Sequence, residues 1–177
     1  MPPTAPYQPS LVRLLHGAMV VLVPLAWLSG AIVYSNLDGR LLRLPLQVPG
    51  NWIDLHGSIG VLLWPPALLF GLVAVSIGRS RLRQPANAAA LIALLLAVGS
   101  GKLMQEEWLR NGQLDQWVYH LHLLAWLLIA AAIAWHVAAA LRRGGTALAR
   151  SMFSTSLRSN DHPRHWPQQL GAWFNRR

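Results

Sequence analysis

Four apolar stretches, each long enough to cross a lipid bilayer, are the feature that most constrains the fold of this chain. They run over residues 14–35, 53–77, 86–104 and 117–141. The hydrocarbon core of a bilayer is about 30 Å thick, so a helix needs about 20 apolar residues to span it. A spanning helix also satisfies its backbone hydrogen bonds internally. We therefore expect an all-α membrane protein with a bundle of four transmembrane helices.

The composition points the same way and excludes several kinds of chemistry. The chain is 54% hydrophobic and only 12% charged, whereas soluble domains carry about 25% charged residues. The absence of cysteine excludes disulfides, iron–sulfur clusters, thiol catalysis and covalent haem attachment through a Cys-x-x-Cys-His motif. The net charge is +9, but the arginines flank the apolar stretches and no nucleic-acid-binding motif accompanies them. They indicate membrane topology, and we expect no nucleic-acid partner.

The distribution of charge predicts the orientation of the bundle. Arginines gather between the second and third stretches and again after the fourth, at residues 79–83 and 142–150. The connection between the third and fourth stretches carries Glu106 and Glu107. Positively charged loops stay in the cytoplasm, so both termini are expected there.

The chain is expected to divide into a membrane domain and a tail. Residues 1–143 form the membrane domain, and residues 144–177 form a polar cytoplasmic tail. Within the tail, residues 166–174 are either a short amphipathic helix at the membrane interface or part of a disordered segment.

Four histidines lie in these stretches at depths that match in pairs. His122 and His136 are 14 residues apart, which is a rise of about 21 Å and a rotation that returns to within about 40° on a helix. Both imidazoles therefore share one helix face. His16 lies near the start of the first stretch and His56 near the start of the second. With the termini inside, His16 matches His136 near the inner surface, and His56 matches His122 near the outer surface.

Two pairs of imidazoles at different depths favour two haem groups. Ionisable residues inside membranes are rare and usually functional, although a single histidine can simply be a hydrogen-bonded packing residue. Zinc sites gather their ligands closer in sequence and often use cysteine or carboxylate. Two axial imidazoles leave no open iron position, which favours electron transfer over oxygen chemistry. Gly57 and Gly60 beside His56 would make room for the flat macrocycle, or serve ordinary helix packing.

Two further polar residues near the outer surface have other interpretations. His120 is turned about 160° away from His136 on a helix, so we interpret it as an interfacial residue. Lys102 is expected to extend toward the interface and pair with Glu106, one turn further on. The alternative is a proton-handling site, or a site for an anionic electron donor, near the outer haem.

The motifs around the histidines resemble those of the prokaryotic cytochrome b561 family, which are di-haem membrane cytochromes of four helices. The resemblance rests on residues 13–16 (Arg-Leu-Leu-His), on residues 56–60 (His-Gly-Ser-Ile-Gly) and on the helix from His122 to His136. It covers residues 11–152. It implies two haem b groups per chain and a multi-pass protein of the bacterial cytoplasmic (inner) membrane. The third stretch departs from the family pattern at residues 84–87 and 98–101.

The resemblance implies a respiratory electron-transfer cytochrome that exchanges electrons with quinone or quinol, since a lipid-soluble carrier can reach a buried haem from the bilayer. One alternative is a membrane anchor and electron relay of a larger oxidoreductase, of the hydrogenase or formate dehydrogenase type. The other is a haem-free membrane scaffold. Expected partners are the lipid bilayer and a redox partner protein, and small residues at positions 88–90 make a homodimer plausible.

Overall fold

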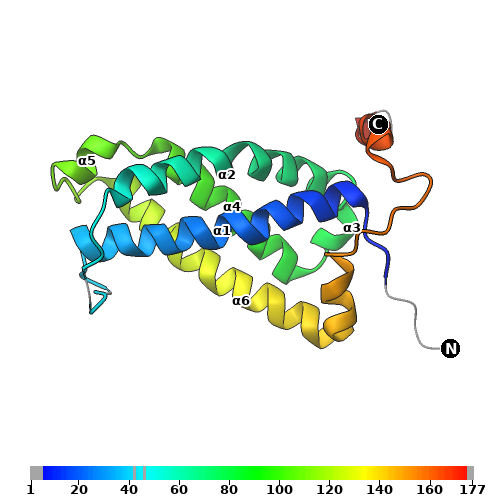
Figure 1. The fold of residues 1–177 in the computed structure, drawn as a ribbon, viewed down its shortest axis with the longest axis horizontal. Coiled ribbons are helices and arrows are strands. Elements are labelled where there is room, and N and C mark those ends of the chain that lie inside the picture. Colours follow the sequence, from blue (N-terminus) through cyan, green and yellow to red (C-terminus); the bar gives the residue numbers. More distant parts are fainter. Residues whose placement is uncertain (1–5, 42, 46, 175–177) are drawn as a thin grey trace.

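The four apolar stretches form four long helices that lie side by side as a bundle (Figure 1). The computed structural model describes residues 6–41, 43–45 and 47–174. The long helices are α1 (Ser10–Leu37), α2 (Trp52–Val75), α4 (Pro85–Leu103) and α6 (Trp117–Ser151). Each is long and apolar enough to cross a membrane. The described residues form helices and no strand, so the predicted all-α membrane fold is confirmed.

Short helical segments fill the connections and the tail. They are α3 (Arg79–Leu82), α5 (Glu106–Arg110), the 3₁₀ turn η1 (Pro163–His165) and α7 (Trp166–Phe174). The segments that lead to the two termini lie at one end of the bundle, and α5 lies at the other (Figure 1). We call these the terminal end and the loop end.

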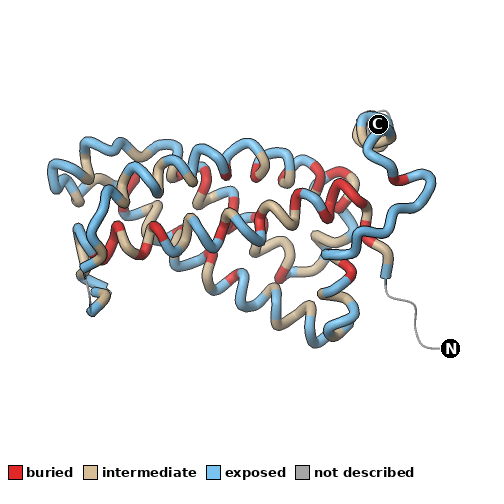
Figure 2. Tube along the Cα trace, viewed as in Figure 1, coloured by how far each residue is buried: buried red, intermediate tan, exposed pale blue. Residues whose placement is uncertain are grey.

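The outward faces of the long helices are apolar, as contact with lipid requires. Val61 is 67%, Leu62 64% and Ile92 66% exposed. Figure 2 shows buried positions recurring along the inward sides of the same helices. Lipid tails are as apolar as these side chains, so the hydrophobic effect alone does not hold the helices together. Close packing and hydrogen bonds between the helices must contribute as well.

The bundle consists of two closely packed helix pairs. Helix α1 packs along α2, and α4 packs along α6, while α2 makes a smaller contact with α4. Among the described residues, α1 and α6 have few backbone positions in close approach. A core layer built from all four long helices lies halfway along this gap, and it includes Met19, Leu63, Leu94 and Ile129. Toward the loop end, the stacked rings of Trp27 and Trp126 bridge α1 and α6.

The C-terminal tail folds back onto the start of α1. Helix α6 bends at Gly145, whose φ of 59° is one that glycine adopts readily. Beyond the bend, Met152, Trp166 and Leu170 pack against an apolar cluster of α1 and α2 at the terminal end. Residues 166–174, for which a short helix and a disordered segment were the two alternatives, form the helix α7. The tail therefore packs on the bundle.

One carboxylate holds this tail in place. Asp161 is 4% exposed. Its Oδ2 atom accepts hydrogen bonds from the Tyr7 hydroxyl and from the Ser10 backbone N–H, the latter at 2.7 Å. Ser10 is the first residue of α1, whose own N-cap residue, Pro9, offers no side-chain cap. Asp161 thus caps α1 from a position 151 residues away in sequence.

A second carboxylate joins α1 to α6 at the loop end. Tyr119 donates a hydrogen bond of 2.6 Å to Asp38, and Arg40 donates two, of 2.5 and 2.8 Å, to the same carboxylate. The Arg40 hydrogen bond lowers the pKa of Asp38 to about 2. The side chain of Asp38 is 2% exposed. The start of α6, which carries one of the four histidines, is therefore tied to the end of α1.

Replacing Asp161 with Ala is expected to free the tail, because α1 loses its cap and the Tyr7 hydroxyl its partner. Loss of such a cap costs about 1–2 kcal/mol, which corresponds to roughly 5- to 30-fold in a local equilibrium. Amide hydrogen exchange at Ser10 to Arg13 should accelerate by about that factor. Asp115→Ala, an exposed acidic residue at the loop end, is the control. Equal exchange in both variants would contradict the capping role.

The docking of the tail is also expected to depend on pH. Burial raises the pKa of Asp161, but the hydrogen bonds from Tyr7 and Ser10 outweigh it, and the pKa is lowered from 3.8. Docking is therefore at full strength above pH 3.8 and weakens as the pH falls through the lower pKa of the folded state. A spin label on Ser159→Cys should become mobile in that acid range. In Asp161→Asn the label should already be mobile at neutral pH; a label that stays ordered there would refute the mechanism.

Candidate functional site

The structure brings together the histidine rings that the sequence predicts to pair. At the terminal end, His16 of α1 and His136 of α6 have ring centroids 6.3 Å apart. At the loop end, His56 of α2 and His122 of α6 have ring centroids 6.0 Å apart. Each pair spans the gap between the two helix pairs, and α6 contributes one ring to each. His120 lies apart from both pairs, with its ring against Tyr119.

The ring separations suit one metal ion between each pair of imidazoles. A metal–imidazole nitrogen bond is about 2.0 Å long, as known for zinc, so two nitrogens on opposite sides of one ion lie about 4 Å apart. Adding the distance from each nitrogen to its own ring centre gives about 6 Å between ring centres. The separations of 6.0 and 6.3 Å match this value. The residues present therefore fit a metal held by two axial imidazoles.

The donor set indicates that such a metal would bring its own equatorial ligands. Among the described residues, no group of three or more His, Cys, Asp or Glu side chains could hold a metal ion. Two imidazoles alone are too few for a tetrahedral zinc site. They are the usual axial ligands of a haem, whose macrocycle supplies the other four nitrogens.

At the loop end, two serines hold the Nδ1 atoms of the histidines. Ser29 Oγ lies 3.0 Å from His56 Nδ1, and Ser100 Oγ lies 2.9 Å from His122 Nδ1. Both serine hydroxyls already donate to a backbone carbonyl. Ser29 donates to Ala26 at 3.1 Å, and Ser100 donates to Leu96 at 2.7 Å. Each serine oxygen therefore accepts from a histidine N–H. This assigns the proton to Nδ1 and leaves Nε2 free as a ligand.

A glycine follows each of these serines and makes room for the ring. A Cβ atom at Gly30 would lie 3.1 Å from His56 Cε1, and one at Gly101 would lie 3.0 Å from His122 Cε1. A Ser-Gly dipeptide of α1 thus contacts His56 of α2, and a Ser-Gly dipeptide of α4 contacts His122 of α6 in the same way. The serine orients the ring, and the glycine lets it lie against the neighbouring helix.

The terminal-end pair has a different environment. His136 Nδ1 lies 3.0 Å from Asn87 Oδ1. The amide of Asn87 is oriented by a 2.8 Å hydrogen bond from its Nδ2 to the Arg81 carbonyl, so Oδ1 is the acceptor. His16 Nδ1 is buried with no hydrogen-bond partner. Its ring meets the edges of Phe70 and Phe153, with centroids 6.4 and 6.3 Å away.

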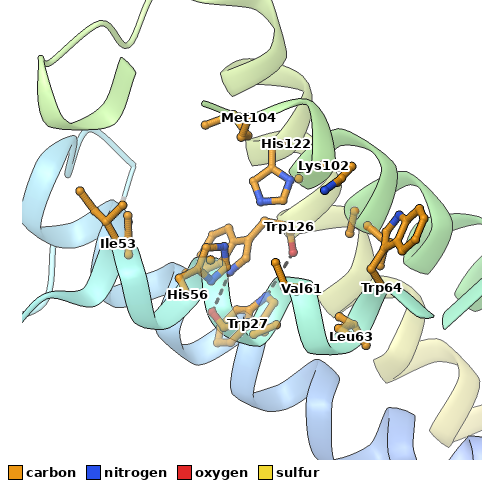
Figure 3. A pocket seen from close by; sticks show the side chains of 18 of the residues that line it. Trp27, Ile53, His56, Val61, Leu63, Trp64, Lys102, Met104, His122 and Trp126 are labelled. Carbon is orange, nitrogen blue, oxygen red and sulfur yellow. Dashed lines mark hydrogen bonds between the residues drawn. The ribbon is translucent and has the colours of Figure 1, made fainter. Parts of the chain in front are cut away.

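A cavity of about 820 Å³ surrounds the loop-end pair. Figure 3 shows His56 and His122 pointing into it from opposite sides. Gly57 and Gly60, which were predicted to make room for a macrocycle, both line it. A Cβ at Gly57 would approach Glu106 to 3.0 Å, and one at Gly60 would meet nothing within 4 Å. Their role in cofactor binding stays a prediction.

A stacked pair of tryptophans bridges α1 and α6 beside this cavity. The rings of Trp27 and Trp126 are 4.8 Å apart and 9° from parallel. Each indole N–H donates to the backbone carbonyl of the other tryptophan, at 3.1 and 3.0 Å (Figure 3). These two hydrogen bonds satisfy both indole donors in an apolar surrounding. Together with the stacked rings, they fix the separation between α1 and α6 at this point.

The expected pairing of Lys102 with Glu106 is wrong. Glu106 accepts from Arg110 at 3.4 Å, which also contacts Asp54. Lys102 instead places its Nζ atom 5.9 Å from the centre of the Trp64 ring, and both residues line the cavity. Lys102 and Glu106 do not lie on one continuous helix, because α4 ends at Leu103 and α5 begins at Glu106, whereas Glu106 and Arg110 both lie on α5.

Sequence reasoning missed the residues that orient the histidines. Ser29, Ser100 and Asn87 are ordinary small polar residues within apolar stretches. Two of them fall in the segments 84–87 and 98–101, where the third stretch departs from the resembled family. A polar residue inside a membrane span needs a partner, and that requirement was the one available signal.

A family model described as prokaryotic cytochrome b561 matches residues 7–155, which is most of the chain. No curated protein and no solved structure matches the chain. The match extends over all four long helices and both histidine pairs.

Replacing Gly101 with Ala is expected to displace the His122 ring, because the new Cβ would lie 3.0 Å from its Cε1 atom. Overpacking of this kind costs about 1–3 kcal/mol. The free energy of unfolding in detergent should fall by that amount relative to Gly99→Ala, since a Cβ at Gly99 meets nothing within 4 Å. Both variants share the gain in helix propensity, so equal stabilities would rule out the close contact.

Proposed function

The chain belongs to the prokaryotic cytochrome b561 family, and we propose that it binds two haem b groups and transfers electrons between them within the membrane. His16 and His136 would hold one haem, and His56 and His122 the other. The observation that carries this proposal is the spacing of the two ring pairs, 6.3 and 6.0 Å between centroids.

The two sites are suited to electron transfer. His16 with His136, and His56 with His122, would each supply two imidazoles to a haem iron, which would leave no position for oxygen or substrate. Haem iron, when bound, supplies a one-electron change between the ferric and ferrous states. The chain holds the two sites apart along α6, where 14 residues separate His122 from His136 and give a rise of about 21 Å. The apolar core layer that includes Leu94 and Ile129 lies between them and excludes water.

The charge distribution supports an orientation with both termini in the cytoplasm. Arginines dominate the terminal end, at positions 13, 79, 81, 83, 142, 143, 150, 158 and 164. Asp161 is the one described acidic residue there, whereas the other acidic residues lie near the loop end. Positively charged segments remain on the cytoplasmic side. In a bacterial inner membrane, the pair at the terminal end would then serve the cytoplasmic side.

The cavity supports quinone or quinol as the electron-exchange partner. Its lining is mostly apolar, and it includes Val61, Leu62 and Trp64, which are 67%, 64% and 40% exposed on the outer surface of α2. In a bilayer that surface faces lipid, so a lipid-soluble carrier could approach the loop-end site from the side. A peripheral redox protein could instead approach from the aqueous end, as in an anchor subunit of a larger oxidoreductase.

The proposal predicts the haem content of histidine variants. Reduced-minus-oxidised spectra and pyridine-haemochrome assays of the detergent-purified chain should give about two haems b per wild-type chain and about one in His122→Ala or His136→Ala. His120→Ala is the matched control on the same helix and should keep both. A wild-type chain that purifies without haem after haem-sufficient expression would instead support a membrane scaffold.

Added quinol would test the partner. Reduction of the bound haem by a soluble ubiquinol or menaquinol analogue within the mixing time of a stopped-flow instrument would support exchange with quinones. Failure with both analogues, together with co-purification of a peripheral redox subunit, would favour the anchor function.

A further inference from the structure

Helix α4 carries no histidine, yet its side chains contact the Nδ1 atoms of the two paired histidines of α6, His122 and His136. We propose that Asn87 and Ser100 are positioning residues, each of which orients one axial histidine and lowers the reduction potential of the site that this histidine serves. The inference rests on the proposed function, because it requires that the histidines bind haem iron.

The spacing along the two helices places one partner at each histidine. Asn87 and Ser100 are 13 residues apart, and His122 and His136 are 14 residues apart, so both intervals span about 20 Å. The helices run antiparallel and pack closely. Ser100 therefore reaches the histidine at the loop end, and Asn87 reaches the one at the terminal end.

Each contact has its donor and acceptor settled by a third group. The Ser100 hydroxyl donates to the Leu96 carbonyl at 2.7 Å and so accepts from His122 Nδ1 at 2.9 Å. The Asn87 Nδ2 donates to the Arg81 carbonyl at 2.8 Å, which leaves Oδ1 to accept from His136 Nδ1 at 3.0 Å. Neither His122 nor His136 can rotate or change tautomer without leaving a polar atom unpaired inside the membrane.

These hydrogen bonds have a defined effect on an iron bound to Nε2. An acceptor at Nδ1–H draws the proton away from the ring and makes Nε2 a stronger base. A stronger base stabilises ferric iron more than ferrous iron, so the reduction potential falls. The loop-end site has acceptors on both histidines, Ser29 and Ser100. The terminal-end site has one, Asn87, because His16 Nδ1 is unpaired.

The two acceptors also differ in kind. At the loop end, the acceptor for His122 is a serine hydroxyl, which also donates a hydrogen bond of its own. At the terminal end, the acceptor for His136 is the side-chain carbonyl of an amide. The two sites can therefore be adjusted independently through one helix that binds no iron. This gives a use to the segments 84–87 and 98–101, where the third span departs from the resembled family.

The test is optical redox titration of the purified holoprotein with two resolved components. Ser100→Ala should raise the midpoint potential of one component, and Asn87→Leu should raise that of the other. Loss of an outer-shell hydrogen bond changes metal affinity by about tenfold or more. A tenfold loss of affinity that affects only the ferric form raises the midpoint potential of a one-electron couple by about 59 mV.

Matched variants separate this effect from a general disturbance. Ser29→Ala should raise the same component as Ser100→Ala, because the two serines serve the same pair. Ser76→Ala is the control: this buried serine donates to the Leu72 carbonyl at 2.6 Å and contacts no histidine. Its potentials should equal those of the wild type. Ser100→Thr keeps the hydroxyl and should restore the wild-type value, and Asn87→Asp should lower its component.

The outcomes distinguish the inference from the function beneath it. Two haems with potentials unmoved in both Ser100→Ala and Asn87→Leu would overturn the inference and leave the proposed function standing. A shift of both components together in either variant would also overturn it. If Ser100→Ala loses a haem, retention in Ser100→Thr supports the positioning role, and loss in both refutes it. A wild-type chain without haem would overturn the proposed function as well.

Discussion

The two histidine sites depend on the gap between the α1–α2 pair and the α4–α6 pair. If α1 and α6 packed as closely as the helices within each pair, the facing imidazoles would have no room for a group between them. The gap is kept open at one point by stacked Trp27 and Trp126, whose indole N–H groups bond to each other's helices. The core layer closes it halfway along. The spaces on either side of this layer are where the histidine pairs lie.

A second constraint acts inside the gap, because the membrane interior offers no water to a polar atom. An imidazole that gives one nitrogen to a metal still has an N–H to satisfy. The chain meets this need with a serine at His56 and His122 and with an amide at His136. The same need explains why small polar residues occur in helices that are otherwise apolar. At each end of the bundle, a carboxylate accepts hydrogen bonds from donors that would otherwise be unpaired. Asp161 does so at the terminal end and Asp38 at the loop end.

Much of the fold and part of the site could be predicted from the sequence. The lengths of the apolar stretches gave four spans, and the 14-residue interval from His122 to His136 predicted that one helix serves both pairs. Depth matching predicted which rings face each other. The Lys102–Glu106 pair was predicted from helical spacing, and it fails because α4 ends at Leu103 and Glu106 begins a separate helix, α5. The tail at residues 144–177 was expected to be polar, and that pattern does not show that it docks on α1.

The sequence by itself determined the number of helices, their apolar outward faces and the histidines that share a depth, because periodicity and bilayer thickness act on each helix separately. Only the tertiary structure decided which serine, glycine or asparagine lies behind each histidine. Those contacts join residues on different helices, and they depend on how far one helix is rotated and shifted against another. The cap that Asp161 places on α1 is of the same kind, since no local pattern joins residues that are 151 positions apart.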